Sequence, residues 1–189
     1  MRHKYETRGI TLARTSLGEA NVLLAILTED LGLVWARAQG LRKPGAKLAA
    51  SLATFAESSL ILVRGKEGWR VAGAVLERSW FAELGQADAR RSAARVSGLL
   101  LRLVMGEGHP ELFAVIIGFF AALAGISADD RDAAEALVVL RILAALGLNA
   151  GEIPGGVGGD YASEHLAAVA AGRPTFINRI NRGIAASGL

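Results

Sequence analysis

The spacing of apolar residues changes near residue 80, and this change limits the folds that the chain can adopt. Residues 1–80 contain short apolar runs that alternate with turn signals, whereas from Trp80 onward the apolar residues recur at helical spacing. A period of two residues is typical of half-buried strands, and a spacing of three and four residues is typical of amphipathic helices. The sequence therefore predicts an α+β protein, with a β domain at residues 1–80 and a helical domain at residues 81–189.

The first domain has the pattern of a small barrel. The expected strands are residues 5–17, 21–28, 33–38, 58–64 and 69–76. A short helical pattern at residues 48–55 falls between the third and fourth strands. Five short strands with an inserted helix favour an OB-fold, although an SH3-like barrel shares much of this pattern.

The second domain has the pattern of a helical bundle. The expected helices are residues 87–105, 112–123, 127–147, 160–171 and 174–187. Residues 112–123 are apolar on nearly all sides, which predicts the central helix of the bundle. The uncharged run at residues 112–128 is shorter than the roughly 20 residues of a membrane-spanning helix, so no membrane segment is expected. Glycines at residues 151–159 predict a flexible connection.

The positive charge of the chain is concentrated in the first domain. Residues 1–80 contain 12 Lys and Arg against 7 Asp and Glu, a net charge of +5, whereas residues 81–189 contain 9 against 11, a net charge of −2. This asymmetry favours a polyanionic partner for the first domain. Ordinary solvated surface charge explains it as well, so the charge leaves both interpretations open.

Three cations lie in one loop after the third expected strand. Arg42, Lys43 and Lys47 flank Pro44 and Gly45, which oppose helix formation. Cations on such a loop favour contact with a phosphate backbone. The full set of expected nucleic-acid-binding residues is Arg37, Arg42, Lys43, Lys47, Arg64, Lys66 and Arg70.

Two tryptophans of the same domain have two alternative roles. Trp35 and Trp69 both lie on expected strands. In OB-folds, aromatic side chains stack on the bases of single strands, but a strand tryptophan also commonly completes a core. The sequence leaves both roles open.

Several short motifs follow one another in a specific order along the first domain. They comprise Gly18 and Glu19, the turn of Thr28, Glu29 and Gly32, the loop of Gly40, Arg42 and Lys43, the apolar Leu48, Leu52 and Phe55, and the strand end from Leu62 to Gly65. Together these motifs resemble the RecO family of bacterial DNA repair proteins. The chain departs from that family in two places. Gly45 and Ala46 stand where the family often has Lys-Ser, and the four-cysteine zinc module of many relatives is missing, because the chain has no cysteine.

The resemblance implies a recombination mediator that is not an enzyme. Such a protein binds single-stranded and duplex DNA through its OB-fold, anneals complementary strands and assists recombinase loading in gap repair, without ATP. The implied partners are the acidic tail of single-strand DNA-binding protein, bound by the helical part, and RecR. The implied location is the bacterial cytoplasm, at the nucleoid. An RNA-binding OB-fold protein and a protein-interaction module that uses the apolar bundle are the alternatives.

A row of arginines on the first long helix is the candidate surface for such a partner. Arg90, Arg91, Arg95 and Arg102 flank an apolar stripe. They suit an acidic peptide with an apolar end, and an ordinary solvated helix face is the alternative.

The residues of common catalytic and metal chemistry are absent or scattered. The glycine cluster at residues 155–159 lacks the Gly-Lys-Ser/Thr ending of a phosphate-binding loop. The four carboxylates between residues 129 and 135 fall at an expected helix start, where they stabilise the positive end of the helix dipole. The three histidines, at positions 3, 109 and 165, are far apart in the sequence. We therefore expect no catalytic residues, no cofactor and no metal site.

Metal analysis of the purified chain tests this last expectation. Because the chain offers no thiolate and only scattered histidines, we expect no stoichiometric zinc and no change of melting temperature on addition of a chelator. One equivalent of tightly bound zinc would contradict it.

Overall fold

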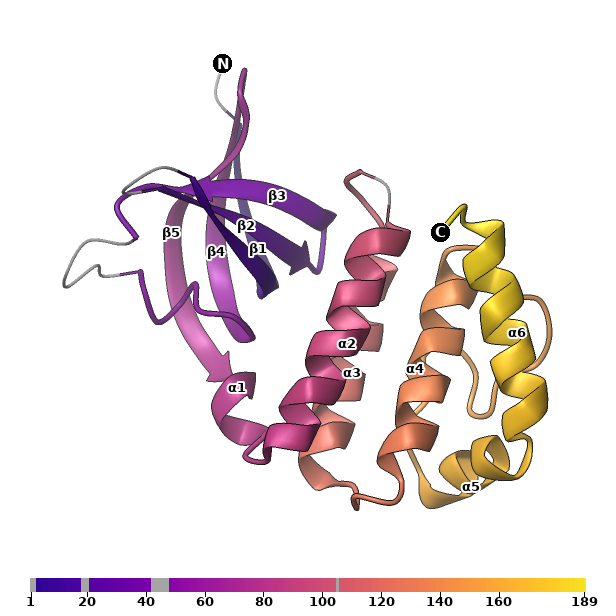
Figure 1. Ribbon diagram of the computed structural model, residues 1–189. Coiled ribbons are helices and arrows are strands. Elements are labelled where there is room, and N and C mark those ends of the chain that lie inside the picture. The colour runs from indigo at the N-terminus through magenta and orange to yellow at the C-terminus, as the bar shows by residue number, and fades with distance from the viewer. Residues whose placement is uncertain (1–2, 18–20, 42–47, 105) are drawn as a thin grey trace. The chain divides into compact units, whose positions relative to one another are not determined.

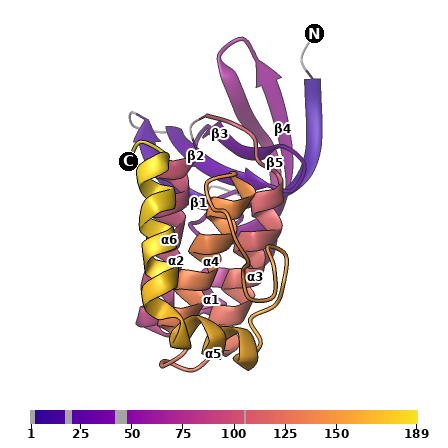
Figure 2. The same ribbon diagram turned by 90° about the vertical axis from the view of Figure 1, so that its right-hand side faces the viewer.

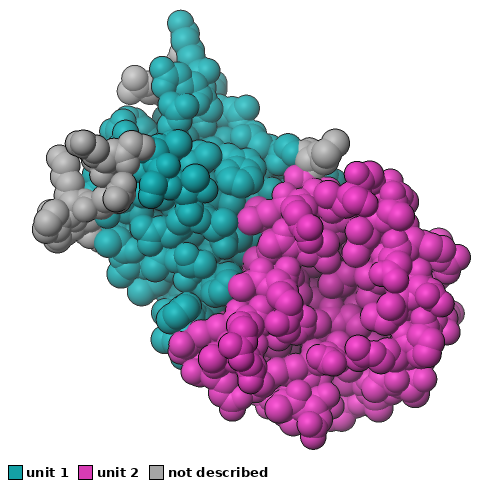
Figure 3. Space-filling view, viewed as in Figure 1, with its two compact units in different colours: residues 1–83, 106–113 teal, residues 84–105, 114–189 magenta. Residues whose placement is uncertain are grey.

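The structure is a computed structural model that describes residues 3–17, 21–41, 48–104 and 106–189. The chain forms two compact units, coloured separately in Figure 3. The strand unit contains residues 1–83 and 106–113, and the helical unit contains residues 84–105 and 114–189. The change of period near residue 80 gives no sign that residues 106–113 group with the strands.

The strand unit is a closed barrel of five strands, in which neighbouring strands pair in antiparallel or parallel directions (Figure 1). Its strands are β1 (His3–Leu17), β2 (Asn21–Thr28), β3 (Gly32–Ala38), β4 (Ala56–Gly65) and β5 (Gly68–Ser79). They follow the order β1-β2-β3-β5-β4, with β3 and β5 parallel and β4 returning to β1. This is the topology of an OB-fold, which confirms the expected fold class and decides against the SH3-like alternative.

The long first strand closes the barrel. Residues 3–10 of β1 pair with β4, and residues 9–17 pair with β2. The register shifts between Thr11 and Ala13, and such an irregularity bends a strand and increases its twist. β1 can therefore pair with both β4 and β2.

The barrel core consists of inward-facing residues from four strands and from the segment after β3. Leu24, Ile26, Val34 and Leu62 are almost completely buried there. Their neighbours along each strand point away from this core, because successive side chains of a strand point to opposite faces, and Ala25, Leu27 and Leu33 among these neighbours are also buried. The alternation read from the sequence thus corresponds to the two faces of the barrel.

The short helix expected at residues 48–55 does not form. This segment is a series of turns, in which Leu52 is fully buried and Phe55 has a φ of 64°. An isolated helix of eight residues is unstable, so tertiary contacts decide its conformation. Burial of Leu52 in the barrel core and the hydrogen bond from the Phe55 N–H to the Thr11 carbonyl, at 2.8 Å, fix the turns instead.

A backbone contact attaches residues 106–113 to the barrel. The Leu33 N–H donates to the Gly108 carbonyl at 2.6 Å, and the Gly108 N–H donates to the Leu33 carbonyl at 3.1 Å. Gly32 has a φ of +69°, and a Cβ at this position would lie 1.9 Å from the Gly108 oxygen. Only glycine fits here, for both conformational and steric reasons.

Five further helices follow the short α1 (Trp80–Glu83) in the described part of the chain. They are α2 (Ala87–Leu103), α3 (Glu111–Gly125), α4 (Arg131–Ala145), α5 (Ser163–Ala171) and α6 (Arg173–Ala186). The expectation that residues 112–123 form the central helix is wrong. α4 packs against α2, α5 and α6, whereas α3 leaves Ala114, Ala121 and Ala124 exposed. Alanine counts as apolar in a sequence pattern, but its small side chain is also tolerated at exposed positions.

The glycine-rich segment at residues 151–159 is held by a buried arginine. Arg141 of α4 is 1% exposed, and its guanidinium donates to the carbonyls of Gly156, at 2.9 Å, Asp160, at 2.8 Å, and Pro154, at 3.4 Å. The same guanidinium lies over the ring of Tyr161. Arg141 thus contacts backbone carbonyls within and directly after this glycine-rich connection. Figure 2 shows it beside α3 and α4.

No helix in the described ranges is both long and apolar enough to cross a membrane.

We predict that Gly32→Ala lowers the free energy of unfolding by about 3 kcal/mol, because it adds a steric clash to left-handed backbone strain. Gly68→Ala is the matched control, since Gly68 also has a positive φ but a Cβ there meets nothing within 4 Å. The control should cost about 1 kcal/mol. Denaturant unfolding measures both, and equal losses would show that the Gly108 contact is unimportant.

Candidate nucleic-acid interface

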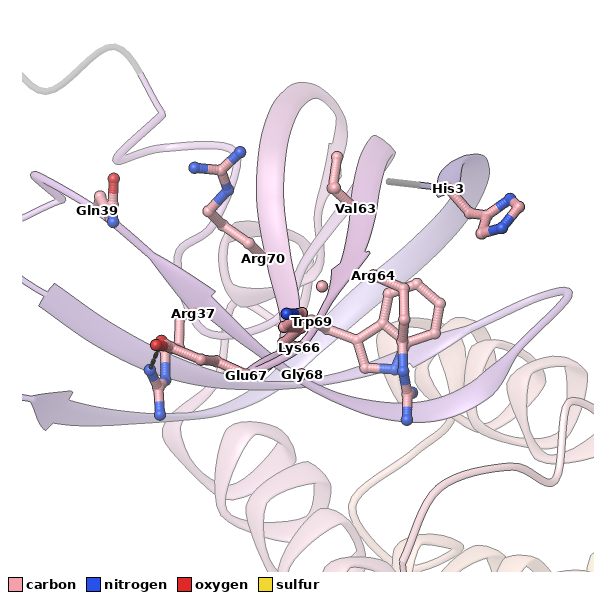
Figure 4. A pocket seen from close by; sticks show the side chains of 11 residues that line it. His3, Arg37, Gln39, Val63, Arg64, Lys66, Glu67, Gly68, Trp69 and Arg70 are labelled. Atoms are coloured by element: carbon pink, nitrogen blue, oxygen red, sulfur yellow. Dashed lines mark hydrogen bonds and ion pairs between the residues drawn. The ribbon is translucent and has the colours of Figure 1, made fainter. Parts of the chain in front are cut away.

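A groove of about 880 Å³ lies on the strand unit at the β4–β5 hairpin (Figure 4). The hairpin supplies most of its lining, and β1 and the end of β3 supply the rest. The charged lining residues are Arg37, Arg64, Lys66, Glu67 and Arg70. The outer face of the central strands and the β4–β5 loop are the parts through which OB-folds bind oligonucleotides and oligosaccharides.

Strand register brings these cations together from distant positions in the sequence. Arg37 of β3 lies beside Arg70 of β5 in the short parallel pairing. In the hairpin, Arg64 lies opposite Trp69, and His3 of β1 lies opposite Arg64 on its other side. The strands β3, β4 and β5 therefore each supply an arginine to one basic surface.

Two of the four groove cations are paired with carboxylates. Arg37 donates to Glu67 at 3.1 Å, and Arg64 forms a close ion pair with Glu107. All four side chains are at least one-third exposed, and an exposed ion pair contributes about 1 kcal/mol or less. Lys66 and Arg70 have no ion pair within the described residues. A phosphate could therefore engage two cations directly and displace weakly held carboxylates from the other two.

The structure places four of the seven residues expected to bind nucleic acid in this one groove: Arg37, Arg64, Lys66 and Arg70. The other three, Arg42, Lys43 and Lys47, lie outside the described residues. Gln39 and His3 also line the groove and were missed, because nothing in their sequence context marks them. Only the strand pairing reveals their position.

The two tryptophans of the barrel differ in their surroundings. Trp35 is 36% exposed on β3, on the same face as Arg37, but does not line the groove. Trp69 is 7% exposed and lines the groove, with the Arg64 guanidinium 4.8 Å from its ring centroid. The ring of Tyr5, which the sequence did not single out, meets Trp69 edge-on at 5.1 Å.

The α2 arginines do not form one uncompensated patch. Arg91 pairs with Asp88 of the same helix, and Arg95 donates to both oxygens of Glu135 on α4. The hydrogen bond to Glu135 raises the pKa of Arg95. Arg102 is exposed, and Arg90 is half-buried. Nothing in this arrangement tests whether the surface binds a partner.

Two carboxylates at the start of α4 accept hydrogen bonds from nearby side chains. Ser127 donates to Asp130 at 2.9 Å, and Arg173 donates to Asp132 at 3.4 Å. Within the ranges that the structure describes, no three His, Asp or Glu side chains gather as a metal site.

The first part of the chain matches a known family. Residues 1–77 match the model of the recombination protein O N-terminal domain. The first domain of the chain is therefore similar to the N-terminal domain of the RecO family. The resemblance predicted from the motifs of the first eighty residues or so is thereby confirmed.

Curated RecO proteins align with a larger part of the chain. DNA repair protein RecO of Acaryochloris marina is 43% identical over 111 residues, which cover 59% of this chain and 38% of the relative. DNA repair protein RecO of Heliobacterium modesticaldum is 31% identical over 143 residues, which cover 76% of this chain and 51% of the relative. For the RecO protein of Dehalococcoides mccartyi strain 195, identity is 42% over 64 residues, 34% of this chain and 25% of the relative. The chain thus spans between a quarter and about half of these RecO proteins.

Proposed function

We propose that the groove of the strand unit binds the phosphate backbone of DNA and that the chain acts in recombinational repair. The observation that carries this proposal is the convergence of Arg37, Arg64, Lys66 and Arg70 on the binding face of an OB-fold. In the sequence, the basic loop follows shortly after Gln39, which lines the groove. Arg42, Lys43 and Lys47 complete the proposed site. The relatives named DNA repair protein RecO support the choice of DNA.

The proposed mechanism is electrostatic and needs no ATP. Cations that bind phosphate release counterions and reduce the repulsion between two strands. Backbone contacts leave the base edges free, so complementary strands held in this way can pair. Annealing and assistance to recombinase loading follow from this property, and no catalytic residue is required.

We propose that residues 1–80 bind nucleic acid and that residues 81–189 bind partner proteins. The partners are the acidic tail of single-strand DNA-binding protein and RecR, in the bacterial cytoplasm at the nucleoid. The proposed tail-binding surface is the α2 face of Arg90, Arg91, Arg95 and Arg102. Arg91 and Arg95 would exchange Asp88 and Glu135 for carboxylates of the tail.

We predict that Lys66→Ala with Arg70→Ala weakens DNA binding at all sequences and lowers the magnitude of the salt slope by about 2, since each phosphate contact contributes about 1. Titrations at several salt concentrations with single-stranded DNA, duplex DNA and structured RNA measure this. Arg182→Ala, which removes an exposed cation of α6, is the control and should change nothing.

The double variant Arg42→Glu with Lys43→Glu tests the basic loop in the same way. If both double variants fold and their salt slopes are unchanged, neither the groove nor the loop is the DNA-binding site. A stronger preference for structured RNA than for DNA would favour the RNA-binding alternative.

We also predict that the chain accelerates annealing of complementary strands without nucleotide, including strands coated with a compatible single-strand DNA-binding protein. A fluorescence annealing assay compares the intact coat with a coat protein that lacks its acidic tail. Acceleration limited to naked strands would contradict the partner assignment. Absence of acceleration at low salt would contradict the mediator function itself and favour an RNA-binding or protein-binding role.

A further inference from the structure

Trp69 is the aromatic side chain of the groove, and its environment is incomplete. The residue is 7% exposed, yet its indole Nε1 finds no acceptor among the described residues. A buried donor without a partner destabilises the free protein. By contrast, Trp80 is fully structural, because its Nε1 donates to Glu57 at 2.8 Å.

A movable cation covers the face of this ring. The Arg64 guanidinium lies 4.8 Å from the ring centroid, and its side chain is 48% exposed. Its carboxylate partner, Glu107, is 38% exposed, so solvent screens the ion pair. Arginine forms bidentate hydrogen bonds with phosphate as it does with carboxylate, so a phosphate can replace Glu107 as its partner. A bound backbone would therefore draw Arg64 away from both Glu107 and the indole.

The space that Arg64 leaves suits a flat, polarizable group. A guanidinium is planar and stacks on aromatic faces much as a base does. Nucleobases offer a π-face of similar thickness. Arg37, Lys66 and Arg70 line the same groove and would contact the phosphates of the strand that carries this base.

We propose that the face of Trp69 covered by Arg64 is a stacking site for an unpaired nucleobase, which the Arg64–Glu107 pair closes in the free protein. The proposal rests on the proposed function of the groove and narrows its ligand to single strands with accessible bases. Bases of a duplex are already stacked on one another and cannot enter. Trp35, which lies outside the groove lining, has no part in this site.

The test compares two probes with the same number of phosphates, an oligothymidylate and an abasic oligomer of equal length. The intact chain should bind the oligothymidylate at least about 5-fold more tightly, as expected for one stacked base. In Trp69→Leu this ratio should fall toward 1 while binding of the abasic probe is retained. Trp35→Leu is the matched control and should keep the ratio of the intact chain.

Arg64→Ala gives an independent answer if Trp69→Leu does not fold. It removes one cation and uncovers the ring, so binding of the abasic probe should weaken while the ratio between the probes increases. An unchanged ratio in Arg64→Ala, or a ratio lost in Trp35→Leu, would overturn the stacking site. Equal, salt-dependent binding of both probes by the intact chain would overturn it as well but leave the proposed DNA groove in place. If neither probe binds at low salt, both proposals fail.

Discussion

The strand unit depends on β1, which pairs along both of its edges. Its first half pairs with β4 and its second half with β2, and the irregularity between Thr11 and Ala13 lies just after the last residue that pairs with β4. This closure holds the β4–β5 hairpin next to β3. Arg37 and Arg70 become neighbours for that reason, although neither lies on β1. The basic groove is thus a consequence of barrel closure.

The carboxylates beside the groove partly neutralise its cations. Glu67 and Glu107 occupy the guanidinium groups of Arg37 and Arg64 in the free protein. A phosphate must displace them, so part of the attraction is already used within the chain. The carboxylate of Glu107 comes from the segment that Leu33 and Gly108 fasten to the barrel.

Much of the architecture could be predicted from the sequence because it depends on local spacing. The five strands, the change to helices near Trp80 and the basic character of the first domain all follow from residues close together in the chain. Prediction failed where one local sequence pattern is compatible with more than one structure. Residues 48–55 have helical spacing, yet burial of Leu52 in the barrel core selects turns.

For the site, the sequence by itself determined which residues are candidates for contact with a phosphate, because charge and turn propensity belong to individual residues and their neighbours. It identified Arg37, Arg64, Lys66 and Arg70 as candidates. Only the tertiary structure decided that these four share one groove, that two of them are paired with carboxylates, and that Trp69 rather than Trp35 lines it. Strand order and register between distant segments fix these contacts, and they depend on the closure of the whole barrel, which no local pattern encodes.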